Sequence, residues 1–360
     1  MSETKKSGFS IRTITGHHLF MPVVCLLIVL LVNVVRTPDF FSISIRNNVL
    51  YGYLIDVINR GSELVILAVG MTLVTAASGG QDISVGAVMA VAAAVCCQIL
   101  SGGEVSTSTL AAPIILAVIA AIAAAGLCGM FNGFLVAKLN IQPMVATLIL
   151  FTAGRGIAQL ITQGQITYIR VDSYRVMGGY IGILPTPILF AAGTVIVAYI
   201  ILNKTALGMY IESVGVNGNA SRLVGLNSTR IKFLTYVICG VLAGLAGVVA
   251  SSRIYSADAN NIGLNLEMDA ILAVALGGNI LAGGKFSLMG SVIGSYTIQA
   301  LTTTLYAMSV SADQLPVYKA IVVIIIVILQ SPVYKKFIKN VKAKRQMSKA
   351  GAMPTEGGGR

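Results

Sequence analysis

The chain has 360 residues, of which 56% are hydrophobic and 11% charged, and its formal net charge is +12. A soluble domain carries roughly 25% charged residues, so this composition excludes an ordinary soluble enzyme and indicates a chain that places much of its surface in lipid. No nucleic-acid partner is expected, because the basic residues gather in particular loops, as the positive-inside rule predicts for a membrane protein.

Apolar runs recur from residue 19 to residue 331, and about 20 apolar residues cross a bilayer as a helix. Gly and Ala are abundant, which favours closely packed helices over a barrel. We therefore predict an all-α fold, a polytopic membrane bundle of about ten transmembrane helices. The predicted spans are 19–35, 57–77, 83–100, 110–130, 143–163, 185–202, 231–251, 268–277, 288–308 and 316–330.

Ten crossings place both termini on the same side of the membrane. The tail 332–360 carries eight Lys and Arg residues against one acid, Glu356, which predicts that both termini are cytoplasmic. The predicted organisation is a cytoplasmic segment 1–18, a transmembrane domain 19–331 with a cytoplasmic loop 203–232, and the basic tail. The tail would also suit contact with anionic lipid headgroups.

A first glycine-rich break, SGGQDISVG, interrupts the apolar sequence at 78–86. Non-helical backbone at membrane depth is tolerated only where it is buried in protein or lines a watery cavity. Asp82 fits two interpretations there: it caps the following helix, or it contacts a solute, since a charge inside a membrane is costly. The candidate pathway residues in this break are Gly79, Gly80, Gln81, Asp82 and Ser84.

A polar stripe runs along the fifth predicted span. Arg155, Gln159 and Thr162 stand at positions i, i+4 and i+7 and so share one helix face. Such a stripe must face protein or water, which makes Arg155 and Gln159 candidate pathway residues. A buried structural pair with an acid across the bundle is the other, favoured interpretation of Arg155.

The loop 203–232 contains the stretch GNASRLVGL at 218–226, with Gly215 just before it and Gly225 near its end. A short helix held out from the membrane there would suit a groove on a soluble partner. An ordinary connecting loop is the alternative.

A second glycine-rich break, GGNILAGGKFSLMG, occupies 277–290 and makes the two halves of the chain a weak internal repeat. Repeated halves with interrupted helices indicate a translocation pathway between them, although a chain with 38 glycines could show two such breaks by chance. The run GGKFS lacks the spacing of a phosphate-binding loop. The candidate pathway residues here are Gly277, Gly278, Asn279, Gly283 and Gly284.

The sequence contains no catalytic motif, no CxxC pair and no His-assisted metal pattern. We therefore expect no enzyme activity, no metal and no cofactor. The five cysteines all lie in apolar segments and are expected to be small buried residues.

These motifs together resemble the permease subunits of bacterial sugar-import ABC transporters of the ribose/galactose/xylose class. The resemblance rests on LAVGMTLVTAASGGQDISVGAVMA, NIQPMVATLILFTAGRGIAQLITQGQ, TALGMYIESVGVNGNASRLVGLN and GLNLEMDAILAVALGGNILAGGKFSLMGSVIGS, and it covers about residues 23–331. Within this class, SADANNIGLNLEMDAILAV and TLILFTAGRGIAQLIT are most similar to the galactofuranose-transporter branch. The chain departs from the usual pattern at Gln81, Asn279 and Ile280, where sugar preference would differ if these positions face the solute.

The resemblance implies a multi-pass permease domain of the bacterial inner membrane that passes a monosaccharide, with galactofuranose or another furanose or pentose as the expected sugar. The implied partners are a cytoplasmic ATP-binding-cassette ATPase that binds the ATP, a periplasmic sugar-binding protein, and a second permease chain, identical or not. It also implies that the cytoplasmic loop holds a coupling helix. The implied coupling residues are Asn217, Gly218, Asn219, Ala220, Ser221, Arg222, Leu223 and Gly225.

Two other functions remain open from the sequence. An ion-coupled secondary sugar transporter would use Asp82 and would need no ATPase. A structural or assembly subunit would have no pathway, so substitutions at Gly79, Gly80 or Asp82 would change stability and leave transport by each folded molecule unchanged.

Overall fold

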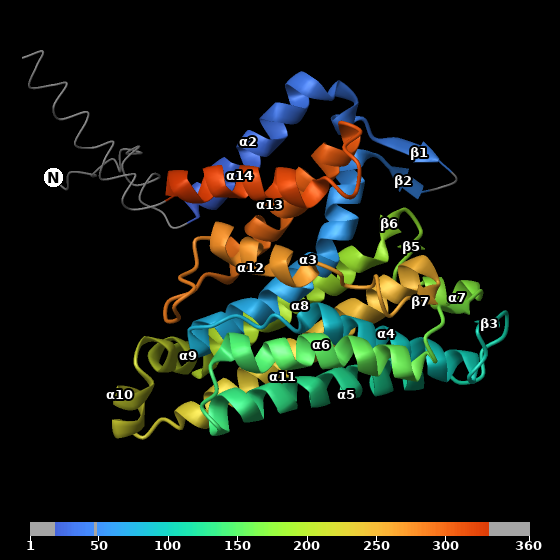
Figure 1. Ribbon diagram of the computed structural model, residues 1–360. Coiled ribbons are helices and arrows are strands. Elements are labelled where there is room, and N and C mark those ends of the chain that lie inside the picture. The colour runs from blue at the N-terminus through green and yellow to red at the C-terminus, as the bar shows by residue number, and fades with distance from the viewer. Residues whose placement is uncertain (1–18, 47–48, 331–360) are drawn as a thin grey trace, which may run out of the picture. The chain divides into compact units, whose positions relative to one another are not determined.

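The computed structural model describes residues 19–46 and 49–330 of the chain (Figure 1). The chain divides into two units, Met1–Val310 and Ser311–Arg360, and each is described by itself. The predicted segment 1–18 and the predicted tail 332–360 lie outside the described residues.

The first unit consists mainly of helices, joined by short strands and turns. Its helices are α2 (Phe20–Arg36), η1 (Pro38–Phe41), α3 (Tyr53–Ser78), α4 (Val85–Ser101), α5 (Ile114–Gly133), η2 (Phe134–Lys138), α6 (Pro143–Ile161), α7 (Asp172–Arg175), α8 (Thr186–Lys204), α9 (Leu207–Val216), α10 (Gly218–Leu223), α11 (Ser228–Ile254), α12 (Leu266–Leu276) and α13 (Leu288–Ala307). Its strands are β1 (Ser44–Arg46), β2 (Val49–Tyr51), β3 (Ser106–Thr107), β4 (Thr167–Ile169), β5 (Tyr180–Ile181), β6 (Leu184–Pro185) and β7 (Ser256–Ala257). The second unit contains α14 (Leu315–Gln330).

Each of the ten predicted spans overlaps one of these helices, so the predicted all-α membrane bundle is confirmed. Among the described residues, five helices are long and apolar enough to cross a membrane: α3, α5 with its continuation η2, α6, α8 and α11. The eighth predicted span is α12, whose 11 residues rise only about 16 Å. That is roughly half the thickness of the hydrocarbon core.

The long helices differ in how much of their surface the protein covers. In α3 the most apolar stretch is 94% buried, whereas in α8 it is 22% buried. Where helices cross, small residues allow backbone contact: a Cβ added to Gly129 of α5 would lie 2.5 Å from the carbonyl oxygen of Tyr236 in α11. Small residues permit this close approach in lipid, where apolar burial alone gives no driving force. The central α3 is therefore surrounded by helices whose outer faces are apolar.

Three loops meet at one end of the bundle, which we call the strand end. There β4 pairs in parallel with β3 and antiparallel with β7, so the loops that follow α4, α6 and α11 form one three-stranded sheet. The helices α9 and α10 lie at the opposite end, which we call the α9 end (Figure 1). These two ends fix the positions of the candidate residues.

Candidate functional site

The two glycine-rich breaks contact each other at the α9 end. Gly79, the left-handed residue that ends α3, lies so close to the second break that an added Cβ would be 2.7 Å from the carbonyl oxygen of Ala282. A Cβ on Gly283, at φ +93°, would lie 3.1 Å from the Cα of Gly79. Two breaks that are about 200 residues apart in the sequence therefore form one structure.

Gly215, in the last turn of α9, completes this contact. An added Cβ there would lie 1.8 Å from the carbonyl oxygen of Ala76 in α3 and 2.5 Å from the backbone nitrogen of Gly284. The backbone N–H of Gly284 also donates a hydrogen bond of 2.9 Å to the same Ala76 carbonyl. We call Ala76, Gly79, Gly215, Gly283 and Gly284 the glycine junction. It joins α9 directly to the ends of α3 and of the second break.

Asn279 holds the second break in shape. Its side-chain oxygen accepts a hydrogen bond from the backbone N–H of Ser287 at 2.5 Å, and its amide donates to Val274 O at 3.1 Å and to Ser291 Oγ at 2.8 Å. Asn279 is only 9% exposed. In this structure its hydrogen-bonding groups therefore serve the fold of the break, while neighbouring Gly278 is exposed.

Asp82 lies in the first break, buried to 2% exposure. Its Oδ1 accepts hydrogen bonds from the backbone N–H of Ser84 at 2.9 Å, from the Ser84 hydroxyl at 2.6 Å and from the Asn132 amide at 3.4 Å. Because α4 begins at Val85 with Ser84 as its N-cap, Asp82 supports the helix start from two residues before the cap, as an Asx turn does. The backbone N–H of Asp82 points to the sulfur of Met71 at 3.4 Å. Gln81, beside it, is half-buried.

These contacts predict different outcomes for two substitutions of Asp82. Asp82→Asn keeps an acceptor oxygen, so we expect stability and transport near those of the wild type. Asp82→Ala leaves the buried backbone N–H and hydroxyl of Ser84 without their acceptor, which costs about 1–3 kcal/mol for each unsatisfied group, while the Asn132 amide keeps its hydrogen bond to Ser84 Oγ. Thermal unfolding of the purified variants measures the difference. Loss of transport in a stable Asp82→Asn variant would instead indicate a role for the charge.

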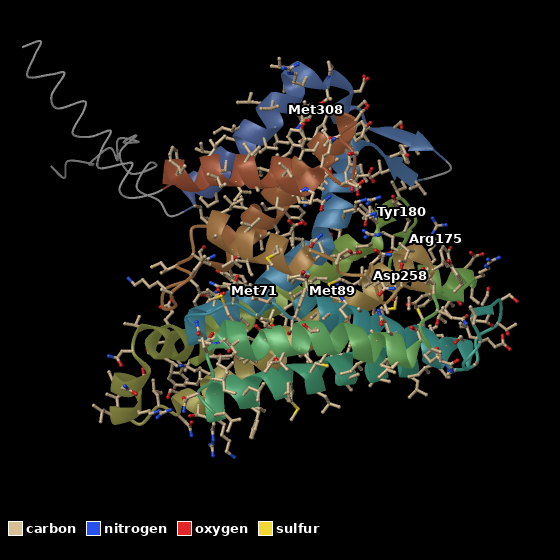
Figure 2. The ribbon with its side chains drawn as sticks, viewed as in Figure 1. Met71, Met89, Arg175, Tyr180, Asp258 and Met308 are labelled. Atoms are coloured by element: carbon tan, nitrogen blue, oxygen red, sulfur yellow. The ribbon has the colours of Figure 1, made fainter. Side chains whose placement is uncertain are left out.

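The predicted polar stripe on α6 exists, and a loop lies against it. Arg155 Nη1 donates to the carbonyl oxygens of Ala259 at 3.0 Å and Ile262 at 2.5 Å. Gln159 Nε2 donates to Asn260 Oδ1 at 2.5 Å. The stripe thus binds the segment between β7 and α12. Asp258 belongs to this segment (Figure 2), and its Oδ1 accepts the backbone N–H groups of residues 260 and 261 at 2.9 and 3.2 Å.

The stretch GNASRLVGL contains the short helix α10, so of the two interpretations of this loop the structure has the helical one. Asn217 caps it by accepting hydrogen bonds from the backbone N–H groups of Asn219 and Ala220. Arg222 anchors it, since its Nε donates to Ser228 Oγ at the start of α11 at 2.6 Å. The following Leu223 is 90% exposed. The adjacent Val224 is 77% exposed, and neighbouring exposed apolar side chains on an anchored helix are suited to contact with a partner.

The candidate pathway residues therefore form two groups. Those of the two breaks lie together with α9, whereas Arg155 and Gln159 bind the segment 258–262. Sequence reasoning missed Gly215, Asn132 and Asn260. Asn132 had a visible signal, because it is a single polar residue within the apolar run that forms α5.

An apolar cavity of about 370 Å³ lies elsewhere, between α3, α8 and α11. Its walls include Leu73, Phe190, Gly193 and Leu242, and Thr194 is its one polar residue among those that line it. A solute rich in hydroxyl groups would lose hydrogen bonds to water there without replacing them. This cavity is therefore a poor candidate for a sugar path.

Comparisons with known proteins agree that the chain is similar to transport permeases. Residues 53–330 match the family described as branched-chain amino acid transport system / permease component. The galactofuranose transporter permease of Escherichia coli (strain K12) is 44% identical over 89% of this chain and 92% of its own length. The fructose import permease of Bifidobacterium longum is 36% identical over 94% of both chains. The ribose import permease of Escherichia coli (strain K12) is 34% identical over 86% of this chain and 92% of its own length. No solved structure matches the chain.

Proposed function

The chain belongs to the family described as branched-chain amino acid transport system / permease component. From this membership we propose that it is the permease subunit of an ATP-binding-cassette importer for a monosaccharide. The observation that carries this proposal is 44% identity with a galactofuranose transporter permease over nearly the whole of both chains. The name of the family points to amino acids, but the three relatives named above are permeases for sugars. Galactofuranose, or another furanose or pentose, is the proposed sugar.

The chain is a multi-pass protein of the inner membrane. We propose that the α9 end faces the cytoplasm and that both termini lie on that side, in accord with the excess of basic residues in the tail and in the loop before α11. The strand end then faces the periplasm, where a sugar-binding protein would dock. A second permease chain would complete the path.

The ATP is bound and hydrolysed by a partner ATPase in this proposal, and α10 is the coupling helix. The anchored geometry of α10 supports this role, because Arg222 fixes one side of the helix while Leu223 remains exposed. The glycine junction, which adjoins α9, would carry movement of this loop to α3 and to the second break. The residues of the two breaks would then shape the gate of the path.

A Leu223→Arg substitution tests the coupling helix. We expect normal insertion into the membrane, but at least about tenfold weaker retention of the ATPase, since Leu223→Arg would place a charge at the centre of the contact, where hot-spot residues are worth about 2 kcal/mol or more. The measurement is co-purification of the ATPase with the tagged permease, together with sugar-stimulated ATP hydrolysis.

Leu139→Arg is the matched control. Leu139 lies after η2, is 52% exposed and lies in a different loop from α10. The control should retain the ATPase. Equal retention of the ATPase by both variants would remove α10 from the coupling mechanism.

The proposed function as a whole is tested by purifying the tagged chain from its native membrane and identifying the co-purifying proteins by mass spectrometry. An ATPase and a sugar-binding protein are expected, and uptake by the reconstituted complex should require ATP. Sugar uptake by the chain alone in ATP-free vesicles, abolished when an ion gradient is collapsed, would replace the proposal with the secondary transporter.

A further inference from the structure

The segment that joins β7 to α12 enters the bundle and reaches the middle of α6. It starts at the strand end, where Ser256 and Ala257 pair with β4. Ala259 then packs against Ala90, Val91 and Ala94 of α4 and Ala158 of α6. Near the end of the segment that leads into α12, a Cβ added to Gly263 would lie 2.6 Å from the carbonyl oxygen of Gly86. The segment thus follows α4 from its last turns down to its first turn.

The distance that this segment reaches into the bundle, measured from the strand end, follows from helix geometry. Gly86 is 15 residues before the end of α4 at Ser101, which corresponds to about 22 Å along the helix. Arg155, which holds the segment, is the thirteenth of the 19 residues of α6. Because α12 begins only at Leu266 and is half a membrane long, the segment 258–265 and α12 together make one interrupted crossing.

Four primary amides are exposed along this inserted segment and on the part of α6 that it contacts. They are Asn260, Asn261 and Asn265 of the segment, and Gln159 of α6. Gln159 donates to Asn260 and Asn261 donates to Asp258 Oδ2 at 2.7 Å, but the remaining donor and acceptor positions of these exposed amides would lose their hydrogen bonds with water if they faced lipid. Their exposed faces must therefore meet water or another protein chain. We name these four residues the amide wall.

Two buried polar atoms behind the wall are also incompletely satisfied. Arg155 Nη2 and Glu267 Oε2 have no hydrogen-bond partner among the residues that the structure describes, and Glu267 is 1% exposed. A polar atom buried in this way generally has a water molecule or a ligand as its partner. This independent observation indicates a polar, hydrated region at the interrupted crossing.

We propose that the amide wall lines the sugar path and hydrogen-bonds the hydroxyl groups of the passing monosaccharide, an inference that rests on the proposed function. Each amide offers both a donor group and an acceptor oxygen, which matches a neutral polyol, whose hydroxyl groups both donate and accept. Contacts of modest strength permit entry and also release, as passage through a path requires. Asp258 and Arg155 act as positioning residues, since they fix the backbone that presents the amides.

Cysteine accessibility tests this inference in the whole transporter. Among the described residues, Cys25, Cys96, Cys97 and Cys239 are buried and Cys128 is half-buried, so a Cys128→Ser background should react little. We expect a membrane-impermeant sulfonate thiol reagent to label Asn260→Cys and Asn261→Cys, and labelling to lower sugar uptake by about tenfold or more. Ile196→Cys is the control, because Ile196 is 57% exposed in the middle of the apolar α8, and it should not be labelled.

The outcomes separate this inference from the proposed function. If the unmodified complex imports sugar with ATP but the two cysteines are unreactive, or are labelled without loss of uptake, the amide wall does not line the path. If the complex shows no ATP-dependent sugar uptake before labelling, the proposed function itself is wrong. Labelling that sugar slows, together with loss of uptake, supports contact with the sugar.

Discussion

A Gly215→Val substitution is expected to abolish sugar uptake, with a loss of more than about tenfold. The reason is steric: a Cβ at this position would lie 1.8 Å from the carbonyl oxygen of Ala76, an atom of the α3 backbone that no side-chain rotation can move. Accommodating it requires α9 to separate from α3, which breaks the hydrogen bond from Gly284 to Ala76. Overpacking of this kind typically costs 1–3 kcal/mol or more. Uptake by the reconstituted complex is the measurement.

Folding and coupling can be separated in the same experiment. Gly215→Ala adds the smallest side chain and should still insert, but with transport per ATP hydrolysed clearly reduced. Gly193→Ala in α8 is the matched control, because an added Cβ there meets no described atom within 4 Å. Wild-type transport in Gly215→Ala would show that close contact between α9 and α3 is unnecessary for coupling.

The helices could be predicted because the physical cause of each is local. An apolar run about 20 residues long must form a helix in lipid to satisfy its own backbone, and each predicted span overlaps a helix. The end of α3 was also visible, since Gly79 takes the left-handed conformation that glycine adopts without strain. The short helix α10 follows from Asn217, a residue type that caps helices well.

The arrangement of the candidate residues could not be predicted in the same way, because it depends on contacts between distant segments. The sequence shows two glycine-rich breaks, but their contact with each other and with Gly215 exists only once α3, α9 and the second break are packed together. Likewise, the depth of Asn260 is set by Gly86 and Arg155, far away in the chain. Hydropathy indicates that a segment is in the membrane, and it carries no information on how deep a non-helical segment lies.

The second large effect is expected at an ion pair between α3 and α11, in which Glu63 is buried and Arg253 is partly exposed. Arg253 Nη2 lies 2.9 Å from Glu63 Oε1 and 3.0 Å from Oε2, and the side chains are 25% and 5% exposed. Coulomb attraction between two buried charges is offset by the cost of removing both from water, so the pair itself adds little stability. Removing Arg253 is different, because the buried Glu63 carboxylate then loses its direct ion-pair partner.

Arg253→Met is therefore expected to lower the free energy of unfolding by about 3–5 kcal/mol, measured as thermal or denaturant unfolding of the purified chain in detergent. The double variant Glu63→Leu/Arg253→Met should recover most of that loss, because it leaves no unpaired charge in the interior.

Arg230→Met, which removes an exposed cation near the start of the same helix, should change stability by less than about 0.5 kcal/mol. A double variant as unstable as the sum of its single changes would mean that the two side chains act independently, whereas recovery gives their coupling energy directly. The expected recovery follows from the physical cause: the fold needs charge balance between α3 and α11 more than it needs the two charges.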